Sequence, residues 1–258
     1  MRRLVRYVCL SALFFPVNFV FSQVEVMEDL IADTELQIYK QHSYFGQIHG
    51  NGFGFGYRFG NIKSITKYNF QEFEFLQLKH PKAIRTPGMN WLGTPRRFIY
   101  GGINQLFALR YGLGTQRTLN EKPYWGGVQV DYILSAGGVL GLAIPQYLSI
   151  LHRDTVENHW YTEVEKFDPN NPDHLFHPGV INGMGPMFKG LFDLRPYPGI
   201  YAKFAFNFDF GKYQERVNAL EAGAMIDVFP IPVPMMATHK KNFFFANFYI
   251  AYHFGRRK

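Results

Sequence analysis

Asn242-Phe-Phe-Phe-Ala-Asn-Phe-Tyr-Ile-Ala-Tyr-His-Phe254 ends four residues before the C-terminus and decides the fold class. In an extended strand, successive side chains point to opposite faces. The odd positions Asn247, Ala251 and His253 would therefore face one way. The even positions are apolar and mostly aromatic and would face the other way: Phe244, Ala246, Phe248, Ile250, Tyr252 and Phe254. This alternation predicts a strand of an all-β, antiparallel, up-and-down transmembrane β-barrel, with lipid outside and a polar lumen inside.

The same alternation recurs upstream and predicts eight strands in a barrel domain that covers residues 45–258. In Gly52-Phe-Gly-Phe-Gly-Tyr-Arg-Phe-Gly60, the aromatic residues would face lipid, and the glycines and Arg58 would face the lumen. Glycines inside a small barrel leave room for long side chains from opposite walls. The predicted strands are 52–60, 64–78, 100–112, 128–135, 139–150, 200–210, 220–228 and 242–254.

Two of these strands have irregular features. In 64–78, Phe73 and Phe75 indicate one lipid face, while the apolar residues at 70, 76 and 78 indicate the other, which predicts a bulge. Gly137-Gly138 predicts a tight turn between the fourth and fifth strands. The fifth strand would then place Leu148 and Ile150 toward lipid.

Two other folds fit parts of the pattern. A soluble, lipocalin-like barrel would face its aromatic residues inward and its charges outward, and sequence alternation alone does not distinguish inside from outside. A ten-stranded barrel would arise if 147–152 paired with 160–166 as a hairpin. The predicted signal peptide and the aromatic C-terminal strand favour the membrane barrel.

The N-terminus predicts a secretory signal peptide over residues 1–22. Met1-Arg-Arg-Leu-Val-Arg6 carries three positive charges, residues 7–21 are nearly all apolar, and Val20-Phe-Ser22 suits cleavage after Ser22. A spanning anchor helix is the alternative, but the run of about 15 residues is shorter than the roughly 20 that such a helix needs. Residues 23–44 would form a polar periplasmic lead-in. Cys9 is the only cysteine, so the mature chain would have no disulfide.

The composition excludes some classes of protein. Cleavage would lower the formal charge from +7 to +4, and the excess is scattered, whereas nucleic-acid binding needs a basic stripe. Aromatic residues make up 18% of the chain, yet its mean hydropathy is only −0.15. After residue 22 no uninterrupted apolar run is long enough for a spanning helix. Alternating strands explain both observations.

The strand count also predicts which connections share a side of the membrane. With the C-terminus in the periplasm, 60–63, 113–124, 152–196 and 230–241 would be extracellular, and 79–99, 136–138 and 211–217 periplasmic. Barrels of this kind prefer long extracellular loops and short periplasmic turns. The loop 79–99 is long for a periplasmic turn. Either the strand count is wrong or this loop is a docking element.

The residues predicted to face the lumen include a set of opposite charges. An eight-stranded barrel is filled by side chains, and unpaired charges inside it would be costly, so these residues should form a salt-bridge network. The alternative role is a proton path or a set of catalytic carboxylates. The network comprises Arg58, Arg110, Lys203, Asp131, Asp209, Glu221 and Asp227.

Catalytic and metal sites are weaker interpretations. His253 could act as a base for Ser149 or Ser135, but neither serine lies in a recognisable nucleophile motif. The long loop mixes imidazoles and carboxylates that could bind a divalent metal, although their spacing is loose. These are His152, His159, Asp168, Asp173, His174 and His177. We therefore expect no catalytic residues, no metal and no cofactor.

Several aromatic side chains fall near the ends of predicted strands. Amphipathic rings at such positions suit the girdles that lie at the lipid headgroups of membrane barrels. Ordinary packing is the alternative for each residue. The predicted girdle residues are Tyr100, Tyr124, Trp125, Tyr197, Tyr201 and Tyr252.

From about residue 45 to its end, the chain resembles the small outer-membrane β-barrel proteins of Gram-negative bacteria, the OmpA-like and OmpX-like eight-stranded class. The segments that carry this resemblance are His49-Gly-Asn-Gly-Phe-Gly-Phe-Gly-Tyr-Arg-Phe-Gly60, Lys79-His-Pro-Lys82, Leu119-Asn-Glu-Lys-Pro-Tyr-Trp-Gly-Gly127, Tyr197-Pro-Gly-Ile-Tyr-Ala-Lys203 and the terminal aromatic strand. The resemblance implies an outer-membrane location. It also implies that Phe248, Ile250, Tyr252 and Phe254 form the signal read by the barrel-insertion machinery, although Gly255-Arg-Arg-Lys258 extends past it.

These predictions favour a non-enzymatic barrel that works through its loops 79–99 and 152–196, as a structural or accessory component of an envelope complex for secretion, assembly or uptake. Its expected partners are outer-membrane lipid, the insertion machinery and envelope proteins, and not nucleic acid. A small transporter or pore, and a barrel hydrolase acting on lipid or peptide, are the alternatives.

Overall fold

The computed structural model describes residues 40–64, 66–88, 96–121, 127–154, 159–171, 180–211, 216–238 and 241–258. They belong to one compact unit, which starts at Ile38. The predicted signal peptide and most of the lead-in 23–44 lie outside the described residues. None of the described helices is long and apolar enough to cross a membrane.

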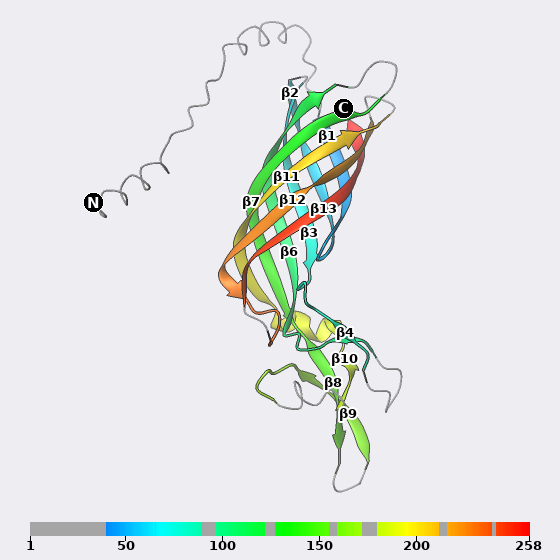
Figure 1. Ribbon diagram of the computed structural model, residues 1–258, viewed down its shortest axis with the longest axis vertical. Coiled ribbons are helices and arrows are strands. Elements are labelled where there is room, and N and C mark those ends of the chain that lie inside the picture. Colours follow the sequence, from blue (N-terminus) through cyan, green and yellow to red (C-terminus); the bar gives the residue numbers. More distant parts are fainter. Residues whose placement is uncertain are drawn as a thin grey trace, which may run out of the picture. The chain divides into compact units, whose positions relative to one another are not determined.

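Eight antiparallel strands close into a barrel (Figure 1). Each strand pairs with its neighbours in the barrel, and the first strand pairs with the last, so that the sheet has no free edge. The barrel strands in chain order are β1 (Lys40–His49), β2 (Gly52–Ser64), β3 (Lys67–Leu78), β6 (Asn104–Asn120), β7 (Gln129–Pro145), β11 (Arg195–Asp209), β12 (Arg216–Val233) and β13 (Asn242–Arg257).

The predicted number of strands is confirmed, but two of the assignments behind it were wrong. Residues 40–44, placed in the lead-in, belong to β1, which pairs with both β13 and β2. The predicted turn at Gly137-Gly138 lies inside β7, which continues from Gln129 to Pro145. One strand was missed and one was divided, so the two errors cancel in the count.

Close packing, and not a turn, explains the glycines at this point. Gly112 lies opposite Gly137, and Gly137 lies opposite Tyr201. A Cβ on Gly112 would lie 2.1 Å from the Tyr201 hydroxyl, so the tyrosine ring occupies the space that the glycines leave. Gly56 similarly accommodates Phe45 of the adjacent strand. The room beside Gly56 is therefore filled from the adjacent strand, and the room beside Gly112 from β11, which lies next to β7 but not next to β6, and not from opposite walls as predicted.

β3 is regular, and the predicted bulge within it was wrong. Its pairing with β6 runs without a shift from Lys67 to Leu78. The register shift between β2 and β3 lies beside their turn, between Ile62 and Ser64. All even positions of β3 therefore face the lumen, where Leu76 and Leu78 are fully buried.

The outer face of the barrel is apolar and the inner face is charged. Phe248 is 81% exposed, whereas Arg58, Glu72 and Asp227 are at most 2% exposed. A soluble, lipocalin-like barrel would have the reverse arrangement. Other exposed apolar residues on the barrel strands include Ile48, Phe53, Phe55, Phe73, Leu113, Ile200, Phe206, Phe244, Ile250 and Phe254.

The two ends of the barrel differ in their connections. Lys40 and Lys258 exchange backbone hydrogen bonds at one end, here called the terminal end. The connections 65–66, 121–128 and 210–215 also lie there. The opposite loop end has the turn 50–51 and the connections 79–103, 146–194 and 234–241. The predicted grouping of the connections was therefore wrong for every connection before β7. The expected sides were counted back from the C-terminus, so dividing β7 moved each of these connections to the other end.

The long connections at the loop end fold together into what we call the loop head, defined as the described parts of 79–103, 146–194 and 234–241. It contains β4 (Arg85–Thr86), β5 (Phe98–Ile99), β8 (Tyr147–Arg153), β9 (Trp160–Lys166), β10 (Ile181–Met184) and the 3₁₀ helix η3 (Met187–Asp193). β8 and β9 form the hairpin of the ten-stranded alternative, but they lie in a separate three-stranded sheet, in which β8 also pairs with β10 (Figure 1).

The loop head has a hydrophobic core of its own. Leu148 and Ile150, predicted to face lipid, are buried there with Phe98, Phe167 and Ile181. Backbone hydrogen bonds join its connections: one connects Ile103 to Met235, another Gln146 to Ile103, and a third Ala237 to Gly101. The three connections are therefore fixed against one another.

Candidate functional site: a closed lumen and a folded loop head

The middle of the lumen contains a buried ionic network centred on Glu72. Its carboxylate accepts hydrogen bonds from Arg58, at 3.0 Å and 3.3 Å, and from Lys203 at 2.9 Å. Ser135 and Tyr201 donate to its other oxygen. Glu72 is thus the point at which residues from four neighbouring or facing strands meet.

Two further carboxylates, Glu74 and Asp227, extend this network through Lys203 and Arg110. Glu74 Oε1 accepts from Lys203 Nζ at 2.5 Å, and its Oε2 accepts from Arg110 at 3.0 Å. Arg110 also forms a two-point contact with Asp227, with its Nε 2.8 Å from Oδ1. Such paired contacts are the strongest geometry for an arginine and a carboxylate. All four groups are at most 3% exposed.

Glu221 connects the network to β13. Arg58 Nη1 donates to Glu221 Oε2 at 2.9 Å, and the Tyr249 hydroxyl donates to Oε1. His253 Nε2 lies 3.0 Å from Oε2. The network therefore contains three Lys/Arg cations and four carboxylates, all deeply buried.

Two of the predicted network residues lie apart from this centre. Asp131 is held by three amides: Gln116 at 2.7 Å, Gln129 at 2.8 Å and Asn207 at 3.1 Å. Asp209 pairs with Arg257 at 2.6 Å, near the terminal end. Five of the seven predicted residues, Arg58, Arg110, Lys203, Glu221 and Asp227, share the central network.

Sequence reasoning missed Glu72, Glu74 and Arg257. Glu72 and Glu74 occupy even positions of β3, like the apolar residues Phe70 and Leu76, so all four side chains point to the same face. This shared face was the sequence signal that could have identified the two glutamates. It was obscured by the expected bulge. Arg257 was missed because the last strand was ended at Phe254, three residues early.

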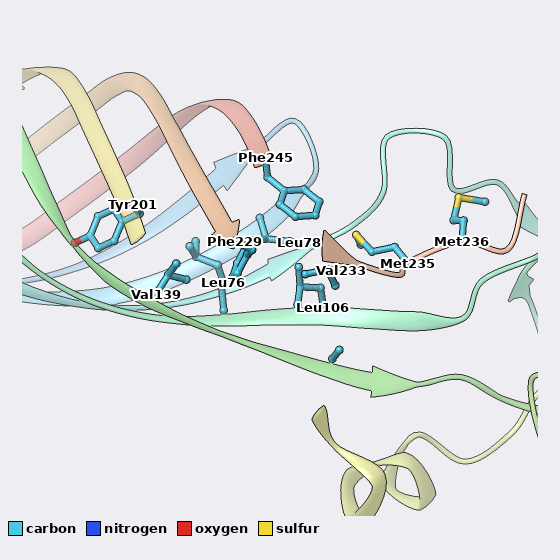
Figure 2. Close-up of a cluster of buried hydrophobic side chains, with 12 residues drawn as sticks. Leu76, Leu78, Leu106, Val139, Tyr201, Phe229, Val233, Met235, Met236 and Phe245 are labelled. Carbon is cyan, nitrogen blue, oxygen red and sulfur yellow. The ribbon is translucent and has the colours of Figure 1, made fainter. Parts of the chain in front are cut away.

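Apolar clusters fill the lumen on both sides of the ionic network. Figure 2 shows the cluster at the loop end, in which Leu76, Leu106, Phe229 and Phe245 pack together. A second cluster, toward the terminal end, contains Phe45, Tyr68, Phe70, Ile133, Ala205, Met225, Tyr249 and Ala251. The Arg58 guanidinium lies 4.3 Å from the centre of the Phe70 ring, so the two layers are in contact.

The residues considered for catalysis are not brought together. Ser149 is on β8 in the loop head, outside the barrel. Ser135 donates its hydroxyl to Glu72, whereas His253 lies against Glu221. The structure thus places neither serine beside His253.

One described member of the predicted loop metal set, His152, lies in a group of possible ligands, and the other two described members do not. His152 lies beside Glu163 and Glu165, with all ligand atoms within 4.8 Å of one another, and sequence reasoning missed both glutamates. His152 Nε2 is 2.5 Å from Glu165 Oε1. His159 instead contacts the Tyr161 ring, and Asp168 accepts from the backbone of Asn170. Asp173, His174 and His177 lie outside the described residues.

The predicted girdle is mostly wrong where it can be described. Tyr201 lies in the lumen, and Tyr197 packs against the buried cluster at the loop end. Tyr100 packs against the core of the loop head. Of the six, Tyr252 is exposed on the outer face, with Phe248, Ile250 and Phe254 of the expected insertion signal. Tyr124 and Trp125 lie outside the described part of the chain.

No family model matches the chain, and no curated protein matches it significantly. Similar solved structures include the attachment invasion locus protein Ail of Yersinia pestis in complex with the heparin analogue sucrose octasulfate, at 8% identity over 86% of this chain and 100% of that chain, with a TM-score of 0.37. Neisserial surface protein A has 9% identity over 85% of this chain and 95% of that chain, with a TM-score of 0.34. The pairing of this chain's own strands confirms the expected fold class, a small antiparallel barrel of eight strands.

Proposed function

We propose that this chain is an integral outer-membrane β-barrel protein that acts without catalysis, as a structural or accessory component of an envelope complex for secretion, assembly or uptake. Its loop head is the working surface. The observation that carries this proposal is the contrast between a lumen occupied by a buried ionic network with apolar clusters and three connections folded around a common core.

The apolar outer face supports the membrane location. Large aromatic side chains cover it at positions where a soluble protein would expose polar groups. Membrane barrels have short periplasmic turns and long extracellular loops. This rule places the terminal end in the periplasm and the loop head outside. Secretion by the signal peptide and insertion by the barrel-assembly machinery are part of the proposal.

The filled lumen argues against the pore. An open channel needs a polar, water-filled interior, and small barrels are instead packed by their own side chains. Here apolar clusters lie on both sides of the ionic network. Binding energy must therefore come from surfaces outside the lumen, and the loop head offers such a surface.

Trp160 on β9 is the best single test of that surface. Trp160 is 46% exposed, and tryptophans often dominate the energetics of protein interfaces. We expect tagged wild type, cross-linked in outer membranes, to retain specific envelope proteins and Trp160→Ser to lose them. Leu119→Ser is the matched control, because Leu119 is an exposed apolar residue near the terminal end.

Heat-modifiable gel migration should report a folded barrel in both variants. Equal capture of partners by Trp160→Ser and wild type would contradict the loop head as the working surface. Large conductance steps in planar bilayers would instead favour the pore.

A further inference from the structure

The loop head contains a cavity of about 190 Å³ at the mouth of the barrel. It lies between the end of β3, the segments β4 and β5, Met184 of β10 and Met235. This volume corresponds to about six water molecules at their share of liquid volume, so it suits one small group and not an extended chain.

The cavity wall is basic. Lys79, His80, Arg85 and Arg97 line it, and no Asp or Glu of the described residues does. Among the residues that the structure describes, no carboxylate lies within ion-pair distance of Lys79, Arg85 or Arg97. Elsewhere in the loop head, Lys166 pairs with Asp193 at 3.0 Å. The cavity therefore has positive charge that no described group of the chain neutralises.

The surrounding sequence has the same bias. The connection 79–103 contains five Lys or Arg residues and no Asp or Glu, whereas 146–194 contains seven acidic and three basic residues. The charges are thus separated between the two connections. An anion would be attracted to the first and repelled from the second.

Gln146 provides a second requirement. It lines the cavity and is 3% exposed, and its Nε2 donates to the backbone oxygen of Ile99. Its Oε1 is buried and has no hydrogen-bond partner in the described chain. A buried acceptor left without a donor costs free energy. A ligand with a hydroxyl group would supply that donor.

We propose that this cavity binds the anionic group of a hydroxyl-bearing saccharide, a sugar phosphate or sugar acid at the end or branch of a surface polysaccharide. Lys79, Arg85 and Arg97 would hold the phosphate or carboxylate, and Gln146 Oε1 would accept a hydrogen bond from a sugar hydroxyl. This inference rests on the proposed function, because it assigns a ligand class to the loop head.

Calorimetric titration of the full-length mature protein in detergent tests the proposal. The probes are glucose 6-phosphate, glucuronate, neutral glucose and inorganic phosphate. We expect the two anionic sugars to bind, glucose 6-phosphate more tightly than inorganic phosphate, and glucose not at all. Raising the salt concentration should weaken binding because the contacts are charged.

Matched variants separate a specific cavity from diffuse charge. Arg97→Gln and Lys79→Gln should each lower the affinity for glucose 6-phosphate by about tenfold, because each variant loses one charge-assisted hydrogen bond. Lys82→Gln is the control from the same connection, since Lys82 is exposed and does not line the cavity. Gln146→Leu should lower the affinity for glucose 6-phosphate but not the affinity for inorganic phosphate. Retained phosphate binding would show that the cavity is intact.

Equal binding of glucose and glucose 6-phosphate, equal losses in Lys82→Gln and Arg97→Gln, or no binding of either anionic sugar at millimolar concentration would overturn the proposal. Capture of envelope proteins through Trp160 is a separate measurement. If it persists when sugar binding fails, the saccharide inference fails alone. If the capture of envelope proteins fails while the sugars still bind, the proposed accessory role is wrong and the saccharide inference is supported.

Discussion

Replacing Lys203 with methionine should destabilise the barrel by about 4 kcal/mol. Lys203 Nζ lies 2.9 Å from Glu72 and 2.5 Å from Glu74, and its side chain is fully buried. Removal of one partner from a buried ion pair costs about 3–5 kcal/mol, because a charge is left uncompensated. Glu72 and Glu74 each keep one arginine at 3.0 Å, so a value near the middle of this range follows.

A compensating change separates charge imbalance from lost packing. The double variant Lys203→Met/Glu74→Gln removes one cation and one anion, and an amide at position 74 can still accept from Arg110. We expect the double variant to be about 2 kcal/mol more stable than the sum of the two single effects, within the usual range for residues in contact. Methionine fills much of the lysine stem, so little cavity forms.

Urea unfolding in lipid vesicles, followed by heat-modifiable gel migration, measures both quantities. Lys63→Met is the control, because Lys63 is exposed on β2 near the terminal end. It should change the free energy of unfolding by less than about 0.5 kcal/mol. A loss below about 1 kcal/mol for Lys203→Met, or strictly additive single effects, would refute the view that the network is a coupled, desolvated unit.

Three further predictions concern the membrane, the lumen and the N-terminus. Phe206→Arg should lower barrel stability by about 2–4 kcal/mol, because it places a cation in lipid. Asn207→Ala should leave the barrel folded, because it removes only one of the three amides that donate to Asp131. Equal tolerance of the two variants in heat-modifiable gel migration would mean that the inner and outer faces are reversed. Wild-type protein in planar bilayers should show no porin-sized conductance steps, because the lumen is packed with side chains. Mass spectrometry of the outer-membrane protein should find a mature N-terminus just after Ser22, and peptides from the first six residues would contradict cleavage.

The faces of most strands could be predicted because the two sides of the wall meet different solvents. Lys203 and Phe204 are neighbours in sequence, yet the first is buried in the ionic network and the second is exposed on the outer face. A period of two is the only backbone geometry that satisfies both environments. Where the contrast is strong, as in 200–210, the predicted and observed faces agree.

β1 was missed because this contrast is weak there. Its outer face includes His42 and its inner face includes Phe45, so polar and apolar residues occur on both sides. The strand is nevertheless held by pairing on both edges, to β2 and β13. Pairing between segments far apart in sequence leaves no periodic signal, which also explains why the loop head could not be predicted from its own pattern.

The most consequential error was the number of strands counted between 79–99 and the C-terminus, because it placed this connection at the wrong end of the barrel. Placed on the terminal end, this connection is an anomaly, a long turn in the periplasm. Placed on the loop end, it supplies Phe98 to the core that it shares with 146–194. The misfit seen in the sequence was therefore evidence that one strand too many had been counted after this segment, through the division of β7. The alternative, a docking element, describes the same segment at the other end.

The ionic network and the basic cavity share no charged residue, so we expect stability and sugar binding to respond independently to changes of charge. The apolar cluster around Leu106 and Phe229 includes Tyr201, which bonds to Glu72, and Met235 and Met236, which line the cavity, so the two sites meet only through apolar packing and this tyrosine. No described charged group of the network is among the residues that line the basic cavity. Changes at sites without shared partners usually add. Lys203→Met should therefore leave the affinity for anionic sugars unchanged in the barrels that fold, and Arg97→Gln should leave the free energy of unfolding unchanged. A shift of both quantities by either variant would show that the barrel interior and the loop head act as one unit.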